Sequence, residues 1–127
     1  MRNDFEHQSQ VALFRWAALN DSKHPGLSMM HAIPNGGLRN IRVAMKLKSE
    51  GVKSGVPDIC LPFPMGNFHG LYIEMKSPKG RISPAQEWWL DSLTSVGYLA
   101  ERCFDWVDAA RIIANYLNLD LKACGIK

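Results

Sequence analysis

The chain has 127 residues, of which 46% are apolar and 21% are charged, and its formal net charge is +3. These values are typical of one soluble globular domain with its own core. No run of about 18 apolar residues predicts a membrane span, and no secretory segment opens the chain, so we expect a cytoplasmic protein. The three cysteines are odd in number and form no Cys-x-x-Cys pair, which argues against a zinc site or a disulfide framework.

Apolar spacing and turn residues predict helices that alternate with short strands. Capping signals set several boundaries, above all Ser83-Pro84-Ala85-Gln86, which has the pattern of a capping box with proline at the first helical position. In chain order we predict a helix over 4–19, a strand over 29–33, a helix over 39–50 closed by Gly51, strands over 59–63 and 71–75, a helix from 84 to Gly97, a strand over 98–103, and a helix from Asp105 to about Leu119.

This order, about α-β-α-β-β-α-β-α, predicts an α/β fold with a small mixed β-sheet flanked by helices. The two central strands are expected to form a hairpin. We expect a single domain over residues 1–119 and a loose C-terminal tail over residues 120–127.

Two short fragments carry the chemistry. Pro57-Asp58 opens one predicted strand, and Glu74-Met75-Lys76 closes the next. Strand alternation places Glu74 and Lys76 on one face and the Met75 side chain on the other. Carboxylates and a backbone carbonyl are the ligands of a hard divalent cation, and a nearby ammonium stabilises charge on a phosphate. The fragments therefore suit a metal-dependent phosphodiesterase, with Asp58, Glu74 and the Met75 carbonyl as ligands and Lys76 beside the reacting groups.

The plainer alternative is a strand that ends in a solvated Glu/Lys pair, with Pro57-Asp58 as an ordinary turn. Two further residues bear on the choice. Gln86, at the start of the following helix, can point back at the site or serve the capping box alone. Glu6, on the first helix, can supply a third carboxylate or remain a solvated acid.

Cationic and backbone-permissive residues flank these fragments. Such residues suit a sugar–phosphate backbone, although a solvated helix face and a tight turn explain them equally well. The tryptophans Trp88, Trp89 and Trp106 favour a core or an interface over base stacking. The candidate DNA-binding residues are Asn35, Gly36, Arg39, Lys53, Ser54, Lys79 and Arg81.

Taken together, the motifs resemble those of the VRR-NUC family, a branch of the PD-(D/E)xK nuclease superfamily, and in particular its stand-alone phage and bacterial members. The resemblance covers residues 4–117. It rests on Glu6, Pro34-Asn35-Gly36-Gly37, the segment from Gly51 to Asp58, Leu71 to Lys76, and Gly80 to Gln86.

The resemblance implies a restriction-endonuclease-like fold and Mg²⁺- or Mn²⁺-dependent cleavage of DNA. It implies that Glu6, Asp58 and Glu74 are the acidic metal-site residues, with the Met75 carbonyl as an additional ligand. Lys76 then matches the catalytic lysine, and Gln86 the glutamine of the next helix. Stand-alone members are associated with homodimers and with branched DNA such as Holliday junctions. A non-catalytic DNA-binding module with the same fold is the alternative function, and a structural phage protein is a more distant one.

Overall fold

The computed structural model describes residues 4–34 and 40–127. Its centre is a four-stranded sheet in the order β1-β2-β3-β4, where the first two pairs are antiparallel and β3 and β4 are parallel. The elements are α1 (Asp4–Asn20), a 3₁₀ turn (Asp21–Lys23), α2 (Pro25–Met29), β1 (His31–Ala32), α3 (Ile41–Ser49), β2 (Ile59–Leu61), β3 (Leu71–Met75), α4 (Pro84–Ser95), β4 (Leu99–Cys103) and α5 (Trp106–Tyr116).

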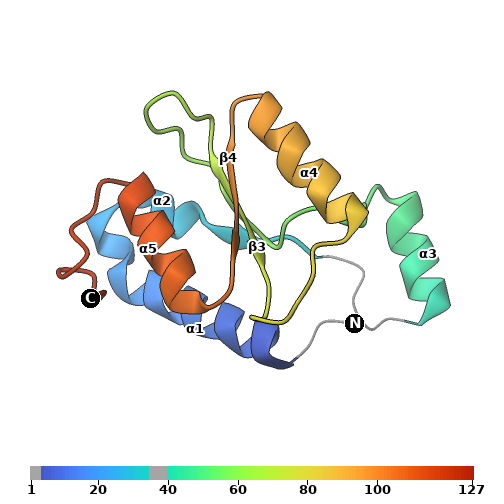
Figure 1. Ribbon diagram of the computed structural model, residues 1–127, viewed down its shortest axis with the longest axis horizontal. Coiled ribbons are helices and arrows are strands. Elements are labelled where there is room, and N and C mark those ends of the chain that lie inside the picture. The colour runs from blue at the N-terminus through green and yellow to red at the C-terminus, as the bar shows by residue number, and fades with distance from the viewer. Residues whose placement is uncertain (1–3, 35–39) are drawn as a thin grey trace.

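The helices cover the sheet from two sides (Figure 1). Helices α1, α2 and α5 lie on one side, and α4, which connects the parallel strands β3 and β4, lies on the other. A parallel pair needs such a crossover, since a tight turn can join only antiparallel strands. The predicted α/β fold with a mixed sheet is confirmed, as is the hairpin of β2 and β3.

The core lies between the sheet and the helices α1 and α5. Alternate residues of the central strands point into it, among them Leu71, Ile73 and Met75, each 1% exposed. Leu13 and Ile113 meet them from the two helices. The other face of β3 carries Tyr72 and Glu74, so the period of the strand separates the core from the face that bears the predicted chemistry. Cys60 and Cys103 are buried free cysteines.

Local signals set most boundaries as expected. The Ser83 hydroxyl accepts a hydrogen bond from the Gln86 N–H and the Gln86 side chain accepts one from the Ser83 N–H, so the capping box is formed. Asp105 caps α5 by accepting from the Asp108 N–H at 2.7 Å. Gly51 has a φ of +100° directly after the end of α3, a conformation in which glycine is strongly favoured.

The predicted strand over 29–33 is mostly wrong. Residues 25–29 form α2, and the strand β1 covers His31 and Ala32 alone within this range. The His24 side chain accepts from the Gly26 N–H and Pro25 occupies the first helical turn, so the Pro-Gly pair starts a helix there.

The predicted loose tail is also wrong. Cys124 and Ile126 are both 3% exposed and belong to the core, and the Cys124 carbonyl accepts a hydrogen bond from Trp16 Nε1 at 2.8 Å. The last helix ends at Tyr116, before the expected Leu119, and Asn118 with a φ of 59° turns the chain back. The tail thereby covers the ends of α1 and α5.

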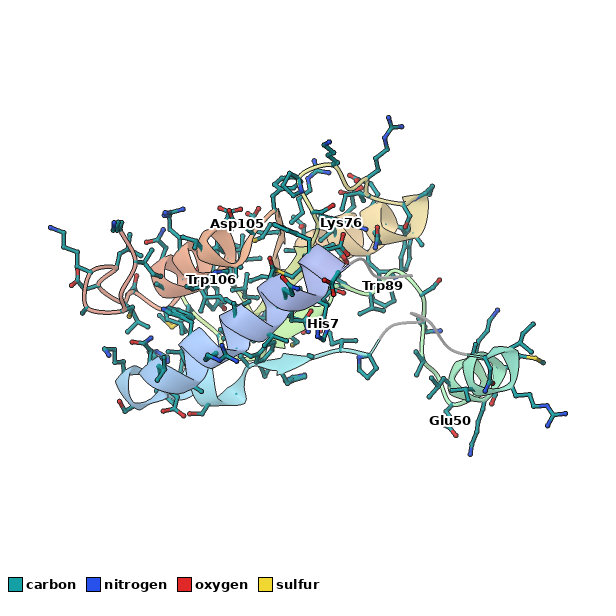
Figure 2. All side chains as sticks on the ribbon, turned by 90° about the horizontal axis from the view of Figure 1, so that it is seen from below. His7, Glu50, Lys76, Trp89, Asp105 and Trp106 are labelled. Atoms are coloured by element: carbon teal, nitrogen blue, oxygen red, sulfur yellow. The ribbon has the colours of Figure 1, made fainter. Side chains whose placement is uncertain are left out.

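Helix α3 differs from all other helices of the part that the structure describes, because it packs closely against no other helix or strand. It stands apart from the rest of the molecule in both views (Figures 1 and 2). Its side chains Ile41 and Met45 are 76% and 66% exposed. No helix among the described residues is long and apolar enough to cross a membrane.

The tail supplies a stability prediction. Ile126→Ala removes a core side chain, and we expect a loss of about 2–4 kcal/mol in the free energy of unfolding, measured by urea denaturation. Lys122→Ala, an exposed change in the same segment, serves as the control and should stay within about 0.5 kcal/mol of wild type. Equal midpoints for both variants would contradict the packed tail.

Candidate metal centre

Asp58 and Glu74 form the centre of the candidate site. Asp58 directly precedes β2 and Glu74 lies in β3, and the register that pairs Ile59 with Ile73 brings their positions together. Both carboxyl groups are buried, with exposed fractions of 3% for Asp58 and 2% for Glu74. Burial of two acids at one strand end is costly unless protons, hydrogen bonds or a cation compensate them.

Protein hydrogen bonds compensate only part of this cost. Asp58 Oδ2 accepts from the Met75 N–H at 2.8 Å, which fixes its carboxylate against the end of β3. Glu74 Oε2 accepts from Gln86 Nε2 at 3.4 Å. Glu74 Oε1 is buried and has no hydrogen-bond partner among the described residues. A buried carboxylate oxygen without a protein partner is the expected position for a ligand atom to a cation.

Gln86 serves both of the roles considered for it. Its Oε1 accepts from the Ser83 N–H at 2.8 Å within the capping box, and its Nε2 faces Glu74. The capping box therefore holds the amide in one orientation, with the donor directed at the site.

Lys76 and Glu6 border the site at the end of β3. The Lys76 N–H donates to the Cys103 carbonyl at 2.8 Å, which continues the pairing with β4, and its ammonium lies near enough to Glu74 to oppose the rise in the pKa of that acid. Glu6, in the first turn of α1, accepts from the Ser77 N–H at 3.1 Å. Figure 2 shows Lys76 beside the start of α1.

The environment raises the pKa of Glu74 to about 9. Burial is the main cause, followed by the charge of Asp58 and the hydrogen bond between the two acids, while Lys76 acts in the opposite direction. The acid pair therefore retains a proton at neutral pH when no cation is present. A cation at Glu74 Oε1 would displace that proton.

The donor set fits a hard divalent ion. Two carboxylates and the Met75 carbonyl are oxygen ligands of the kind that Mg²⁺ and Mn²⁺ prefer, and Mg²⁺ usually keeps several waters. Within residues 4–34 and 40–127, no three His, Cys, Asp or Glu side chains converge as a complete metal cage. Glu6 accordingly lies outside the immediate pair, with one oxygen bonded to Ser77.

The predicted DNA-binding residues divide into three groups. Lys79 and Arg81 are exposed on the loop that follows Lys76. Lys53 and Ser54 are exposed on the segment that leads to Asp58, and both line a cavity next to α4. Asn35, Gly36 and Arg39 lie outside the described residues.

That cavity was not predicted from the sequence. It opens between α3 and α4, with Ala44, Leu47, Val52 and Trp89 among its lining residues. Trp88, which we expected to lie in a core or an interface, is 61% exposed. The apolar residues of α3 and α4 could be seen in the sequence. Apolar composition alone, however, does not show that the side chains stay exposed in the fold.

The buried acid pair makes metal-free stability depend on pH. The pKa of Glu74 is raised from 4.5, its ordinary value, to about 9 in the folded protein. The contribution of Glu74 to stability is therefore full below pH 4.5 and is lost as the pH rises towards about 9. We expect the melting midpoint in EDTA to fall by several degrees between pH 6 and pH 9. Glu74→Gln should flatten this slope, and Mg²⁺ should restore the wild type at pH 9. Parallel slopes for the two proteins would contradict the assignment.

Comparisons with known proteins identify the family of the chain. The family model of the VRR-NUC domain matches residues 2–104. A solved structure described as a VRR_NUC domain protein superposes with a TM-score of 0.78 and 27% identity, covering 94% of this chain and 93% of that one. The Fanconi-associated nuclease 1 homolog of Schizosaccharomyces pombe is 32% identical over 77 residues, which are 61% of this chain but only 11% of that protein. The chain is thus a member of the VRR-NUC family.

Proposed function

We propose that the protein is a divalent-metal-dependent endodeoxyribonuclease. The observation that carries this proposal is the buried pair of Asp58 and Glu74, with Glu74 Oε1 lacking a hydrogen-bond partner among the described residues and Lys76 beside it. Family membership and the nuclease named among the relatives support it. The proposed cofactor is Mg²⁺ or Mn²⁺.

In this mechanism Asp58, Glu74 and the Met75 carbonyl hold the ion. When bound, a divalent ion polarises the phosphate and lowers the pKa of a water molecule. The Lys76 ammonium faces the reacting phosphate, where it stabilises developing negative charge or orients the attacking water. Lys53, Lys79 and Arg81 bind neighbouring phosphates without reading the base sequence.

Gln86 and Glu6 act as positioning residues. Gln86 donates to Glu74 Oε2, which would leave Oε1 available to hold the ion. Glu6 accepts from the Ser77 N–H and so would fix the backbone next to Lys76. Each support arises from an element other than β3, so the site depends on the packing of α1 and α4 against the sheet.

We further propose that the substrate is branched DNA such as a Holliday junction. The protein would act as a homodimer in a bacterial or phage-infected cytoplasm. Cleavage of both strands at a junction requires two sites, which a dimer supplies. The exposed Ile41 and Met45 side chains on α3 offer an apolar surface for pairing.

The activity test uses supercoiled plasmid with Mg²⁺. Lys76→Ala and Asp58→Asn should each reduce the rate of nicking by at least about 100-fold, since each removes charge from the reacting centre. The control Lys122→Ala also removes one exposed lysine and should cut at the wild-type rate. Full activity of Lys76→Ala, or equal cutting in EDTA, would refute the proposal. Junction binding in EDTA without any cleavage in Mg²⁺ would identify the non-catalytic module instead.

The substrate test compares a four-way junction with a linear duplex of the same arm sequence. We expect the junction to be cut at least tenfold faster, on the order of 1.4 kcal/mol of discrimination. Light scattering should give twice the chain mass of 14.3 kDa, and Ile41→Asp should shift the protein to the monomer. A monomeric wild type with no preference for the junction would refute both statements.

A further inference from the structure

The cavity between α3 and α4 is a feature that the metal site does not use. Its volume is about 800 Å³, within the range of sites that hold small organic groups. Its walls come from Ala44 and Leu47 of α3, Val52 after it, and Ala85 and Trp89 of α4. We call it the α3–α4 cavity.

The walls combine aromatic rings with cations. Trp88 and Trp89 are in edge-to-face contact, with ring centroids 5.3 Å apart and planes at 88°, so their ring faces point in different directions. Lys48 and Lys53 also line the cavity, with the hydroxyl of Ser54 beside them. Aromatic faces next to cations are the elements with which proteins bind unpaired nucleotides: the rings stack on bases and the cations bind phosphates.

The cavity adjoins the metal centre through the backbone. Gly55 has a φ of +90°, and a Cβ atom there would lie 2.8 Å from the backbone of Ala85, so the two segments are in direct contact. Gly55 follows the cavity residue Ser54 and leads to Asp58. Ala85 precedes Gln86, which is bonded to Glu74. The contact between Gly55 and Ala85 therefore links the cavity to the segments that carry Asp58 and Gln86.

We propose that the α3–α4 cavity binds an unpaired nucleobase of the DNA strand close to the point of cleavage. The inference rests on the proposed nuclease function and makes it more specific: at the branch point of the substrate, a nucleotide next to the scissile phosphate is unpaired when the DNA is bound. Trp88 and Trp89 stack on the base, and Lys48 and Lys53 bind the phosphates on either side of it.

Charge favours this occupant over a second copy of the chain. Helix α3 carries Arg42, Lys46 and Lys48, and Lys53 follows it. Two copies joined through this cavity would bring the same cations together, whereas a DNA strand brings the opposite charge. Ile41 and Met45 are not among the residues that line the cavity, so their exposed side chains remain available for pairing of copies.

The test measures DNA binding in EDTA, with cleavage suppressed. Two ligands of equal length are compared, one a complete duplex and the other a duplex with a five-nucleotide unpaired gap. Tryptophan emission should be quenched by the gapped ligand and much less by the duplex. Trp88→Ala should lower the affinity for the gapped ligand about tenfold and change duplex affinity little, because stacking contributes about 1–3 kcal/mol per base. Trp106→Phe, a tryptophan of α5 outside the cavity, is the matched control and should retain the quenching and the preference.

The possible results of this test distinguish the cavity proposal from the nuclease proposal. Equal affinity and quenching with both ligands would overturn the inference while leaving the nuclease proposal intact. A change of mass by light scattering in Leu47→Lys would also overturn it, because a second copy would then fill the cavity. Gap-dependent quenching in a protein that cuts no DNA in Mg²⁺ would support the cavity as a base-binding site and reject the nuclease function.

Discussion

The burial of two carboxyl groups at one end of a small sheet constrains much of the surrounding structure. Asp58 and Glu74 are among the few buried charged side chains of the described chain, and their partners come from different elements. The Met75 N–H belongs to β3, the Gln86 amide to α4 and the Lys76 ammonium to the strand end. Removal of any partner would leave a buried polar group with fewer favourable interactions. The residues that bind this pair must therefore be held in fixed positions.

Several of these supports serve structure and site together. Gln86 completes the capping box of α4 with one end of its amide and faces Glu74 with the other. The crossover that makes β3 and β4 parallel also places the first turn of α4 at the acids. A residue with two such roles is expected to tolerate few substitutions, since glutamate would keep the acceptor of the cap but place a third acid against Glu74.

The parts that the sequence predicted are those set by neighbouring residues. Ser83-Pro84-Ala85-Gln86 defines its own helix start, and the alternation in Leu71 to Met75 separates the core from the site without knowledge of the rest of the fold. The parts it did not predict depend on distant contacts. The tail is ordered by Trp16, 108 residues away, and the exposure of α3 follows from the lack of an opposing surface, which a local pattern cannot reveal.

The candidate site and helix α3 differ in how firmly the fold holds them. The acids and Lys76 lie at the end of a strand packed into the core, where the precise placement that phosphoryl chemistry needs can be maintained. The apolar and cationic residues that suit substrate recognition lie on α3, which packs on no other element among the described residues. A nine-residue helix gains little stability from its own hydrogen bonds, so a bound strand or a second copy would stabilise it considerably. If the proposed function holds, substrate preference could change through α3 while the proposed metal centre stays the same.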